Sequence, residues 1–88
     1  MKDELQDLID LLHERKCSCV LRNGEIYTFE RRGVEDLYAL LREQPGLLLG
    51  ADVADKVVGK GAAALMVLGR VRRVYADVLS EPAYGLLF

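Results

Sequence analysis

The chain alternates between segments whose apolar residues recur every three or four positions and short segments that are apolar throughout. Near the N-terminus, acids separate four apolar residues at helical spacing: Leu5, Leu8, Ile9 and Leu12. This pattern predicts an amphipathic helix, whose early acids suit the positive end of the helix dipole. A second amphipathic helix is predicted over residues 34–42, and Pro45-Gly46 then ends it. Residues 47–49 are too few for an element and are expected to fill the core beneath a loop.

Residues 17–22 and 25–30 are apolar runs that flank Asn23-Gly24. Asn-Gly between apolar runs predicts a hairpin, because a type I′ turn needs positive φ at both central positions. A two-residue turn is expected to place Cys17, Cys19, Leu21 and Ile26 on one face and Val20, Tyr27 and Phe29 on the other. Both faces are then apolar, which favours a sheet that is covered by helices on both sides.

The C-terminal half predicts a strand over residues 53–58, a helix over 60–68 and a strand over 71–79. A helix between two strands is the usual crossover of a parallel pair. Ser80 and Pro82 then suit the cap and first turn of a last helix. The predicted fold class is α/β: a three-layer α/β/α sandwich in which an N-terminal antiparallel hairpin joins a parallel βαβ unit.

Composition indicates one domain over residues 1–88 and limits its partners. Apolar residues are 51% of the chain, charged residues are 30%, and the formal charge is −2, as is typical of a globular domain. The acidic balance gives no general attraction to nucleic acid, and no apolar run approaches the roughly 20 residues that cross a bilayer. The first residues are too polar for a secretory signal. We therefore expect a cytoplasmic protein that binds neither nucleic acid nor a membrane.

The cysteines, the histidine and several arginines, which are residue types common in functional sites, are interpreted here as structural or solvated residues. Cys17 and Cys19 are interpreted as buried apolar residues, and a redox-sensitive pair or half of a metal site shared across a dimer are the alternatives. His13, the only histidine, is interpreted as a solvated residue near the end of the first helix. Five arginines are interpreted as solvated residues at a sheet edge: Arg31, Arg32, Arg70, Arg72 and Arg73.

The junction after the predicted strand 53–58 is the main candidate for a binding site. A helix start offers unpaired backbone N–H groups and the positive end of the dipole to an anion. Gly59, Lys60 and Gly61 form this start, and the Lys60 ammonium adds a positive charge. The alternative is that the glycines only let the strand turn into a closely packed helix. A P-loop is excluded because Ala54 and Gly61 stand where that motif needs a glycine and a serine or threonine.

Two aspartates are expected near the carboxyl ends of the parallel strands, where ligands bind in open α/β sheets. Asp55 and Asp77, with Lys56 or Lys60, could form either a buried structural ion pair or a functional cluster with shifted pKa values. Ser80 is interpreted as a helix cap rather than a nucleophile, because no histidine lies near it in the sequence. The candidate ligand-binding residues are Asp55, Lys56, Gly59, Lys60, Gly61, Asp77 and Ser80.

The order of the predicted elements resembles the cytidine-deaminase-like fold. Residues 74–83, Val-Tyr-Ala-Asp-Val-Leu-Ser-Glu-Pro-Ala, look like the deaminase strand that leads into Glu-Pro-Cys. Residues 54–66 together with 74–83 are also similar to a bacterial family of unknown function whose known structures have this fold. The resemblance runs from Leu8 to about Leu87. Because the family usually continues into further strands, the resemblance implies that this domain is C-terminally short.

The chain departs from the deaminases where their chemistry takes place. A zinc deaminase needs a His or Cys and a Glu at the start of the crossover helix, and Pro-Cys-x-x-Cys at the next helix. These positions fall here on Gly59 or Lys60, on Gly61 or Ala62, and on Ala83 and Leu86. Zinc-dependent deamination is therefore excluded, and neither a metal nor another cofactor is expected.

The sequence thus favours a zinc-free, deaminase-like domain that binds a small anionic or nucleotide-like ligand at the helix start after the third strand. A non-catalytic domain is the favoured interpretation, and an enzyme that uses Lys60 or Asp77 without a metal stays open. The alternative is an oligomerisation or protein-interaction module, with a homodimer as one form. The apolar chain end at residues 86–88 and the free edges of a small sheet motivate that alternative.

Overall fold

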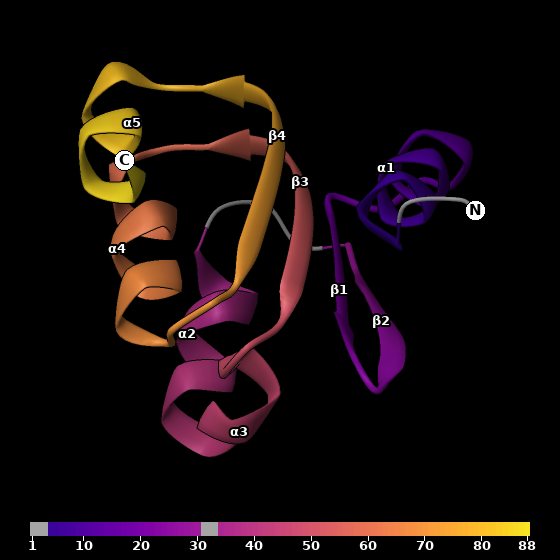
Figure 1. The fold of residues 1–88 in the computed structure, drawn as a ribbon, viewed down its shortest axis with the longest axis horizontal. Coiled ribbons are helices and arrows are strands. Elements are labelled where there is room, and N and C mark those ends of the chain that lie inside the picture. The colour runs from indigo at the N-terminus through magenta and orange to yellow at the C-terminus, as the bar shows by residue number, and fades with distance from the viewer. Residues whose placement is uncertain (1–3, 31–33) are drawn as a thin grey trace.

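The computed structural model describes residues 4–30 and 34–88, which form a four-stranded mixed sheet and five helices (Figure 1). The elements are α1 (Glu4–Glu14), β1 (Cys19–Asn23), β2 (Glu25–Phe29), α2 (Glu35–Glu43), α3 (Pro45–Leu48), β3 (Asp52–Val58), α4 (Lys60–Leu68), β4 (Arg73–Leu79) and α5 (Glu81–Leu87). The sheet order is β2-β1-β3-β4; β1 pairs antiparallel with both neighbours, and β3 pairs parallel with β4. The predicted α/β class, the hairpin and the parallel β3–α4–β4 unit are confirmed.

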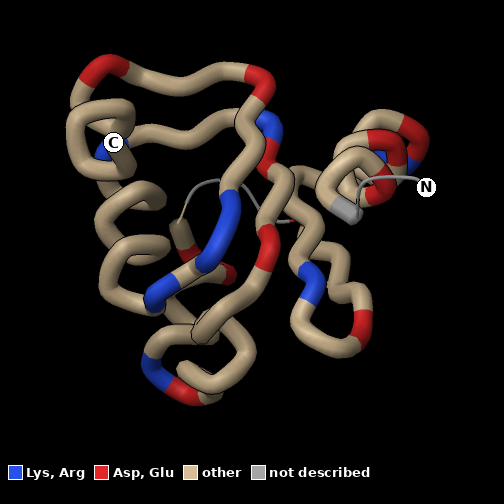
Figure 2. The backbone as a smooth tube through the Cα atoms, in the orientation of Figure 1, with Lys and Arg blue, Asp and Glu red and all other residues tan. Residues whose placement is uncertain are grey.

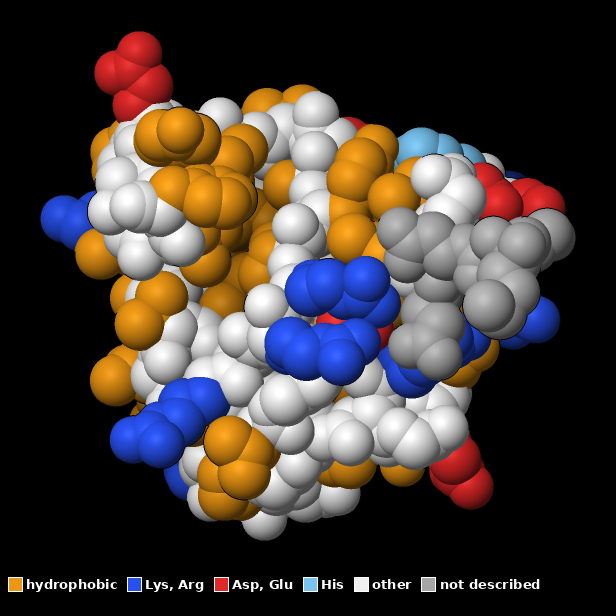
Figure 3. Space-filling model, in the orientation of Figure 1, with side chains coloured by type: hydrophobic (Ala, Val, Ile, Leu, Met, Phe, Trp, Pro, Cys, Tyr) orange, Lys and Arg blue, Asp and Glu red, His pale blue; other side chains and the backbone are white. Residues whose placement is uncertain are grey.

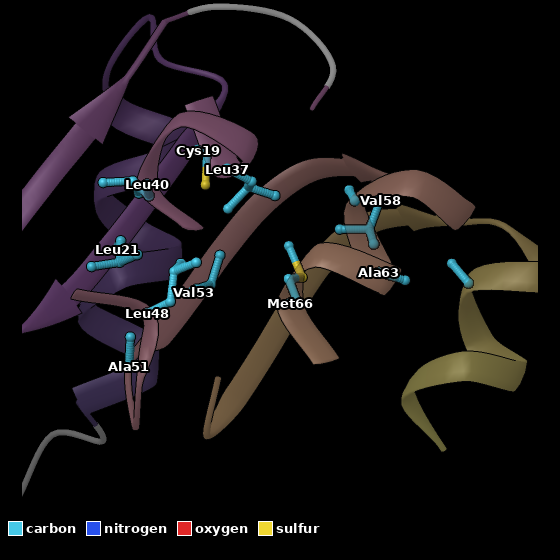
Figure 4. Close-up of a cluster of buried hydrophobic side chains, with 12 residues drawn as sticks. Cys19, Leu21, Leu37, Leu40, Leu48, Ala51, Val53, Val58, Ala63 and Met66 are labelled. Carbon is cyan, nitrogen blue, oxygen red and sulfur yellow. The ribbon is translucent and has the colours of Figure 1, made fainter. Parts of the chain in front are cut away.

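Helices lie on both sides of this sheet, with α1 apart from the others (Figure 1). On the α1 side, Leu8 and Leu12 are fully buried against Val20 and Ala54 of the sheet. The larger core lies on the other side, beneath α2, α4 and α5 (Figure 4), and its most buried members include Leu21, Leu48, Val53, Val58, Ala63 and Met66. Each fully buried leucine contributes about 1.5–3 kcal/mol to folding, so the predicted apolar stripes of α1 and α2 hold the helices to the sheet.

The register of the hairpin differs by one residue from the predicted one. Asn23 pairs with Glu25, so only Gly24, at φ 76°, separates the two strands. Asn23 does not adopt the positive φ of a type I′ turn, because its side chain is bonded elsewhere: Nδ2 lies 3.0 Å from the carbonyl oxygens of Gly46, Leu47 and Leu49. These contacts hold Asn23 in β1 and tie the end of the strand to α3.

The changed register moves side chains from one face of the hairpin to the other. Tyr27 and Phe29 pack against the larger core, whereas Ile26 is 44% exposed. The prediction that Ile26 shares the core face was therefore wrong. Cys19 faces the larger core, but Cys17 precedes β1 and packs on the α1 side. The two thiols are buried and free, as expected of apolar residues, but they lie on opposite faces of the sheet.

Two further boundaries differ from the prediction. Pro45 stands in the first turn of the short helix α3, where only a loop was expected, because proline already has the φ of a first helical residue. Leu48 is fully buried as expected of a core plug, while Leu49 is 57% exposed. β4 begins at Arg73, two residues later than predicted.

At the end of α4, the residue with positive φ is an arginine, and the glycine beside it has negative φ. Helices commonly end with a glycine at positive φ, but Gly69 has φ −77° and the next residue, Arg70, has φ 60°. Gly69 is needed for another reason: a Cβ there would lie 2.8 Å from Cβ and Cδ1 of the buried Leu48. The close approach of α4 to α3 therefore depends on Gly69, and Arg70 carries the backbone strain.

We expect opposite effects from substitutions at these two neighbouring positions. Arg70→Gly should raise the free energy of unfolding by about 1 kcal/mol, because the left-handed conformation costs an L-residue roughly 1–2 kcal/mol. Gly69→Ala should lower it by about 1–3 kcal/mol, because Leu48 cannot move freely in a packed core. Urea unfolding of the two variants measures both changes, and shifts of the same sign would contradict this account of the turn.

Candidate functional site

The charged residues of the predicted site are separated by the sheet. Asp55 is 7% exposed and stands opposite Cys19 of β1, on the side of the larger core. Lys56 follows it on the strand and so points to the other side, where it helps to lower the pKa of Asp77. Among the described residues, no ion pair joins Asp55 to Lys56 or Lys60. Of the two aspartates, only Asp77 therefore lies where a lysine, Lys56, acts on its charge.

The two helix starts lie at the same edge of the sheet, since each follows one of the parallel strands. Gly59 caps α4 in an extended conformation, and Lys60 is exposed. A Cβ at Gly61 would come 3.2 Å from Cγ1 of Val34, which supports the packing interpretation of this glycine. Ser80 caps α5, because its Oγ accepts the N–H of Ala83 at 3.2 Å. The interpretation of Ser80 as a cap is confirmed.

The starts of α4 and α5 do not fit a zinc ion. The side chains at the positions of the deaminase ligands are hydrogen, methyl, alkyl or ammonium groups, which belong to Gly59, Lys60, Gly61, Ala62, Ala83 and Leu86. Across residues 4–30 and 34–88, no group of three or more His, Cys, Asp or Glu side chains could hold a metal ion. Within the same residues, no helix has the length and apolar character that a membrane span requires.

A hollow of about 670 Å³ opens where the end of α1 and the following loop meet the carboxyl end of β3. Its lining combines three cations, three carboxylates, the only histidine and small or apolar groups: His13, Glu14, Arg15, Lys16, Cys17, Ser18, Glu30, Asp55, Lys56 and Val57. Ligand pockets commonly enclose about 300–1,000 Å³. Of the predicted site residues, Asp55 and Lys56 line this hollow; Gly59, Lys60, Gly61, Asp77 and Ser80 do not.

Asp55 is the buried carboxyl group of this hollow. Its burial raises the pKa to about 6, because removal from water disfavours the carboxylate; the Val57 and Lys56 N–H groups and the Cys19 thiol oppose the shift. The Val57 N–H lies 3.3 Å from Oδ1. Burial, and then the charge of Asp55, raise the pKa of the Cys19 thiol. Asp55 therefore exchanges its proton close to neutral pH, which is common for carboxyl groups in functional sites.

His13 is exposed near the end of α1, as the sequence indicated, but it also contacts another side chain. Its Nε2 lies 2.8 Å from Oδ1 of Asp77, and the hydroxyl of Tyr75 donates to the same oxygen at 2.6 Å. The hydrogen bond from the Tyr75 hydroxyl and then the contact with His13 lower the pKa of Asp77. The hydrogen bond between Tyr75 and Asp77 also raises the pKa of Tyr75. The contact ties the end of α1 to β4 beside the hollow. The sequence offers little signal for it, because 64 positions separate His13 from Asp77.

A second buried carboxylate lies at the opposite end of β3, where Figure 2 shows basic residues of β4 beside it. Asp52 is 3% exposed, and both of its oxygens are bound by Arg73 at 3.0 and 2.8 Å and by Arg72 at 3.3 and 3.2 Å. The bonds from Arg73 and then Arg72 lower the pKa of Asp52 against the effect of burial. Arg72 is exposed next to the edge strand as interpreted, with 58% of its side chain exposed against 35% for Arg73, but the sequence interpretation missed that both arginines bind Asp52.

The other three arginines of that interpretation have different outcomes. Arg70 is exposed, as expected, and Arg31 and Arg32 lie outside the described residues. A signal for the Asp52 centre was present in the sequence. An acid directly before a continuously apolar strand needs a cation, and two arginines stand at the start of the next strand.

Comparisons with known proteins give a family and a fold. A protein-family model described as a domain of unknown function (DUF1893) matches residues 7–88. The crystal structure of a DUF1893 family protein from Thermotoga maritima has the same fold, with a TM-score of 0.80 and 22% sequence identity. The match covers 97% of this chain and 59% of that chain, so this chain spans little more than half of the longer protein. No curated protein matches the chain.

Proposed function

The chain belongs to the DUF1893 family of domains of unknown function, and we propose that it binds a small anionic or nucleotide-like ligand in the hollow at the carboxyl end of β3. The observation that carries this proposal is the lining of the hollow. The exposed cations Arg15, Lys16 and Lys56 surround an opening in which the one buried carboxyl group is that of Asp55. A pocket that combines convergent polar groups with a shifted pKa is the usual place for a ligand.

The charge balance of the lining favours an anion when Asp55 carries its proton. The three cations then face the carboxylates of Glu14 and Glu30 only. The sequence alone favoured the helix start at Gly59–Gly61, and that location stays a prediction. We place the ligand in the hollow because several cations and a cavity of suitable volume come together there.

We also propose that the domain has the three-layer arrangement of the cytidine-deaminase-like fold without the zinc chemistry. The order of elements, the parallel β3–α4–β4 unit and the helices on both sides of the sheet support this. The positions that hold the metal in deaminases carry no zinc-ligating side chain here. A binding role therefore suits the chain better than deamination, and we assign no catalytic residue.

Titration with sulfate, pyrophosphate and adenine nucleotides, followed by thermal shift and calorimetry, tests this proposal. A ligand at a hundredfold excess over its Kd should raise the free energy of unfolding by about 2.7 kcal/mol. Lys56→Ala should weaken binding by about tenfold, which is about 1.4 kcal/mol. The matched control is Lys60→Ala, which removes an exposed lysine of the helix start outside the hollow and should leave the Kd unchanged.

The two variants also decide between the two locations. Weaker binding in Lys60→Ala alone would move the site to the start of α4. If none of the probes stabilises the wild-type protein, the proposed function is wrong.

A further inference from the structure

We propose that the hollow binds a guanine mononucleotide, whose base donates N–H groups to the Asp55 carboxylate while its phosphate contacts the cations at the opening. This assignment rests on the proposed function, because it names the ligand class of the same site. Asp55 is buried in the lining, whereas Arg15, Lys16 and Lys56 are exposed. A lining of this kind favours a ligand with N–H donors at one end and a negative charge at the other.

The two buried aspartates of β3 differ in what the protein provides for them. Asp52 is 3% exposed and both of its oxygens are bound by two arginines; Figure 3 shows basic side chains gathered around this small acidic area. Asp55 is 7% exposed, and across the part of the chain that the structure describes it forms no ion pair. Its hydrogen bond from the Val57 N–H measures 3.3 Å, longer than the roughly 2.7–3.2 Å that is usual. Because a buried carboxylate is costly without strong partners, Asp55 is the acceptor that remains for a ligand.

The hydrogen-bonding edge of guanine is complementary to a carboxylate. Its N1–H and N2–H groups are adjacent donors, and the two oxygens of a carboxylate can accept both, as they accept the paired N–H groups of an arginine. The same edge of adenine or cytosine has one amino donor beside a ring nitrogen that is itself an acceptor, and this nitrogen would face a carboxylate oxygen. Uracil has a single donor between two carbonyl oxygens. An ionised Asp55 therefore selects guanine among the bases.

The ionisation of Asp55 is compatible with this selection. Its pKa of about 6 makes the carboxylate the main form above that pH. Hydrogen bonds to the charged form lower a pKa, so the donors of the base stabilise the carboxylate further. A simple anion such as sulfate gains when Asp55 is protonated, whereas the guanine base uses the ionised group. The two kinds of ligand therefore probe the two protonation states of one residue.

The two ends of such a ligand match groups on opposite sides of β3. Successive strand residues point to opposite faces, so Lys56 lies across the strand from Asp55, and both line the hollow. A nucleotide separates its base from its phosphate by a ribose and can contact both groups around the end of the strand. Cys17 and Val57 add apolar groups to the lining. The volume of about 670 Å³ also lies within the roughly 300–1,000 Å³ of ligand pockets, so the hollow has room for a base beside Asp55.

Calorimetric titration with guanosine and adenosine monophosphates (GMP and AMP) at pH 8 tests the assignment. GMP should bind the wild-type protein at least about tenfold more tightly than AMP. Asp55→Asn should reverse this preference, because a carboxamide has one acceptor and one donor and so matches adenine. The matched control Glu30→Gln makes the same chemical change at an exposed residue of the lining and should alter the ratio of the two Kd values by less than about twofold. Equal affinities in the wild type overturn the assignment, and so does a ratio that Asp55→Asn leaves unchanged.

Two further probes keep this outcome separate from the proposed function. Lys56→Ala should weaken GMP and AMP equally, by about tenfold, because both carry the same phosphate. If sulfate or pyrophosphate binds but GMP and AMP do not differ, the guanine assignment is wrong and the anion site stands. If neither the inorganic anions nor the nucleotides bind, both proposals are wrong. Free arginine presents a similar pair of N–H donors, and tighter binding of arginine than of GMP would overturn the assignment of the base.

Discussion

Replacing both Arg72 and Arg73 with methionine is expected to lower the free energy of unfolding by about 3–5 kcal/mol at neutral pH. The double change leaves the buried carboxylate of Asp52 without the guanidinium groups that bind both of its oxygens. A buried charge that loses its partners keeps its desolvation cost. Chemical denaturation measures the loss. Arg70→Met removes an exposed arginine from the same segment and should change stability by less than about 0.5 kcal/mol.

The pH dependence of this loss separates the ion pairs from simple side-chain packing. The arginines hold the pKa of Asp52 below 3.8 in the folded protein. Their stabilising contribution is therefore fully present above that value and is lost as the pH falls through the lower folded pKa. In the double variant, the buried carboxyl group should instead take up a proton readily. The difference between wild type and variant should shrink as the pH approaches about 3; a constant difference would show that packing alone is lost.

Periodicity was sufficient for the elements that bury one apolar stripe. The spacing of Leu8 and Leu12 located α1, and the β-branched run that ends at Gly59 located both the strand and the start of α4 at Lys60. These predictions succeeded because a helix or strand with one apolar face has few ways to cover it. The parallel pairing of β3 with β4 followed from the length of the helix between them.

The register of the strands and the contacts between residues far apart in the sequence could not be predicted from periodicity. Asn23-Gly24 correctly marked the hairpin, but the strand positions changed by one because the Asn23 amide binds carbonyl groups of the α3 segment, more than 20 residues away. The partners of Asp52 depend on the register of β3 against β4, which places Asp52 opposite Arg73. A turn motif or a charge pattern can indicate that such a contact exists, but by itself it does not fix the register that forms it.

The candidate site was only partly predictable for a related reason. Successive strand residues point to opposite faces, so Asp55 and Lys56 could not both face a common ligand from the middle of a sheet. They line one hollow because it lies at the end of the sheet, where the segment between α1 and β1 closes it. That segment contributes Arg15 and Lys16, which are distant from Asp55 in the sequence.

Asp55→Asn is expected to raise the free energy of unfolding by about 3 kcal/mol at pH 8, the opposite of the effect at the Asp52 centre. In the folded protein, the pKa of Asp55 is about 6, against an ordinary value of 3.8. The folded state therefore binds the proton more tightly, and the contribution of Asp55 to stability falls as the pH rises from about 4 to about 6. Asparagine keeps an oxygen that can accept the Val57 N–H and the Cys19 thiol, but it has no charge to bury.

Denaturant unfolding between about pH 4 and pH 8 checks this, because the stability difference between Asp55→Asn and wild type should grow across that range and then level off. A variant that is no more stable than wild type at pH 8 would show that burial of the Asp55 carboxylate does not lower the free energy of unfolding.

The same variant also tests the role of the hollow. Sulfate keeps its charge over this range, and its binding to the wild-type protein should strengthen as the pH falls through about 6, since Asp55 gains a proton near the anion. Asp55→Asn should bind sulfate at pH 8 at least as well as wild type and should lose most of this pH dependence. A carboxyl group that lowers stability while making ligand binding respond to pH is the kind of compromise that functional sites commonly retain.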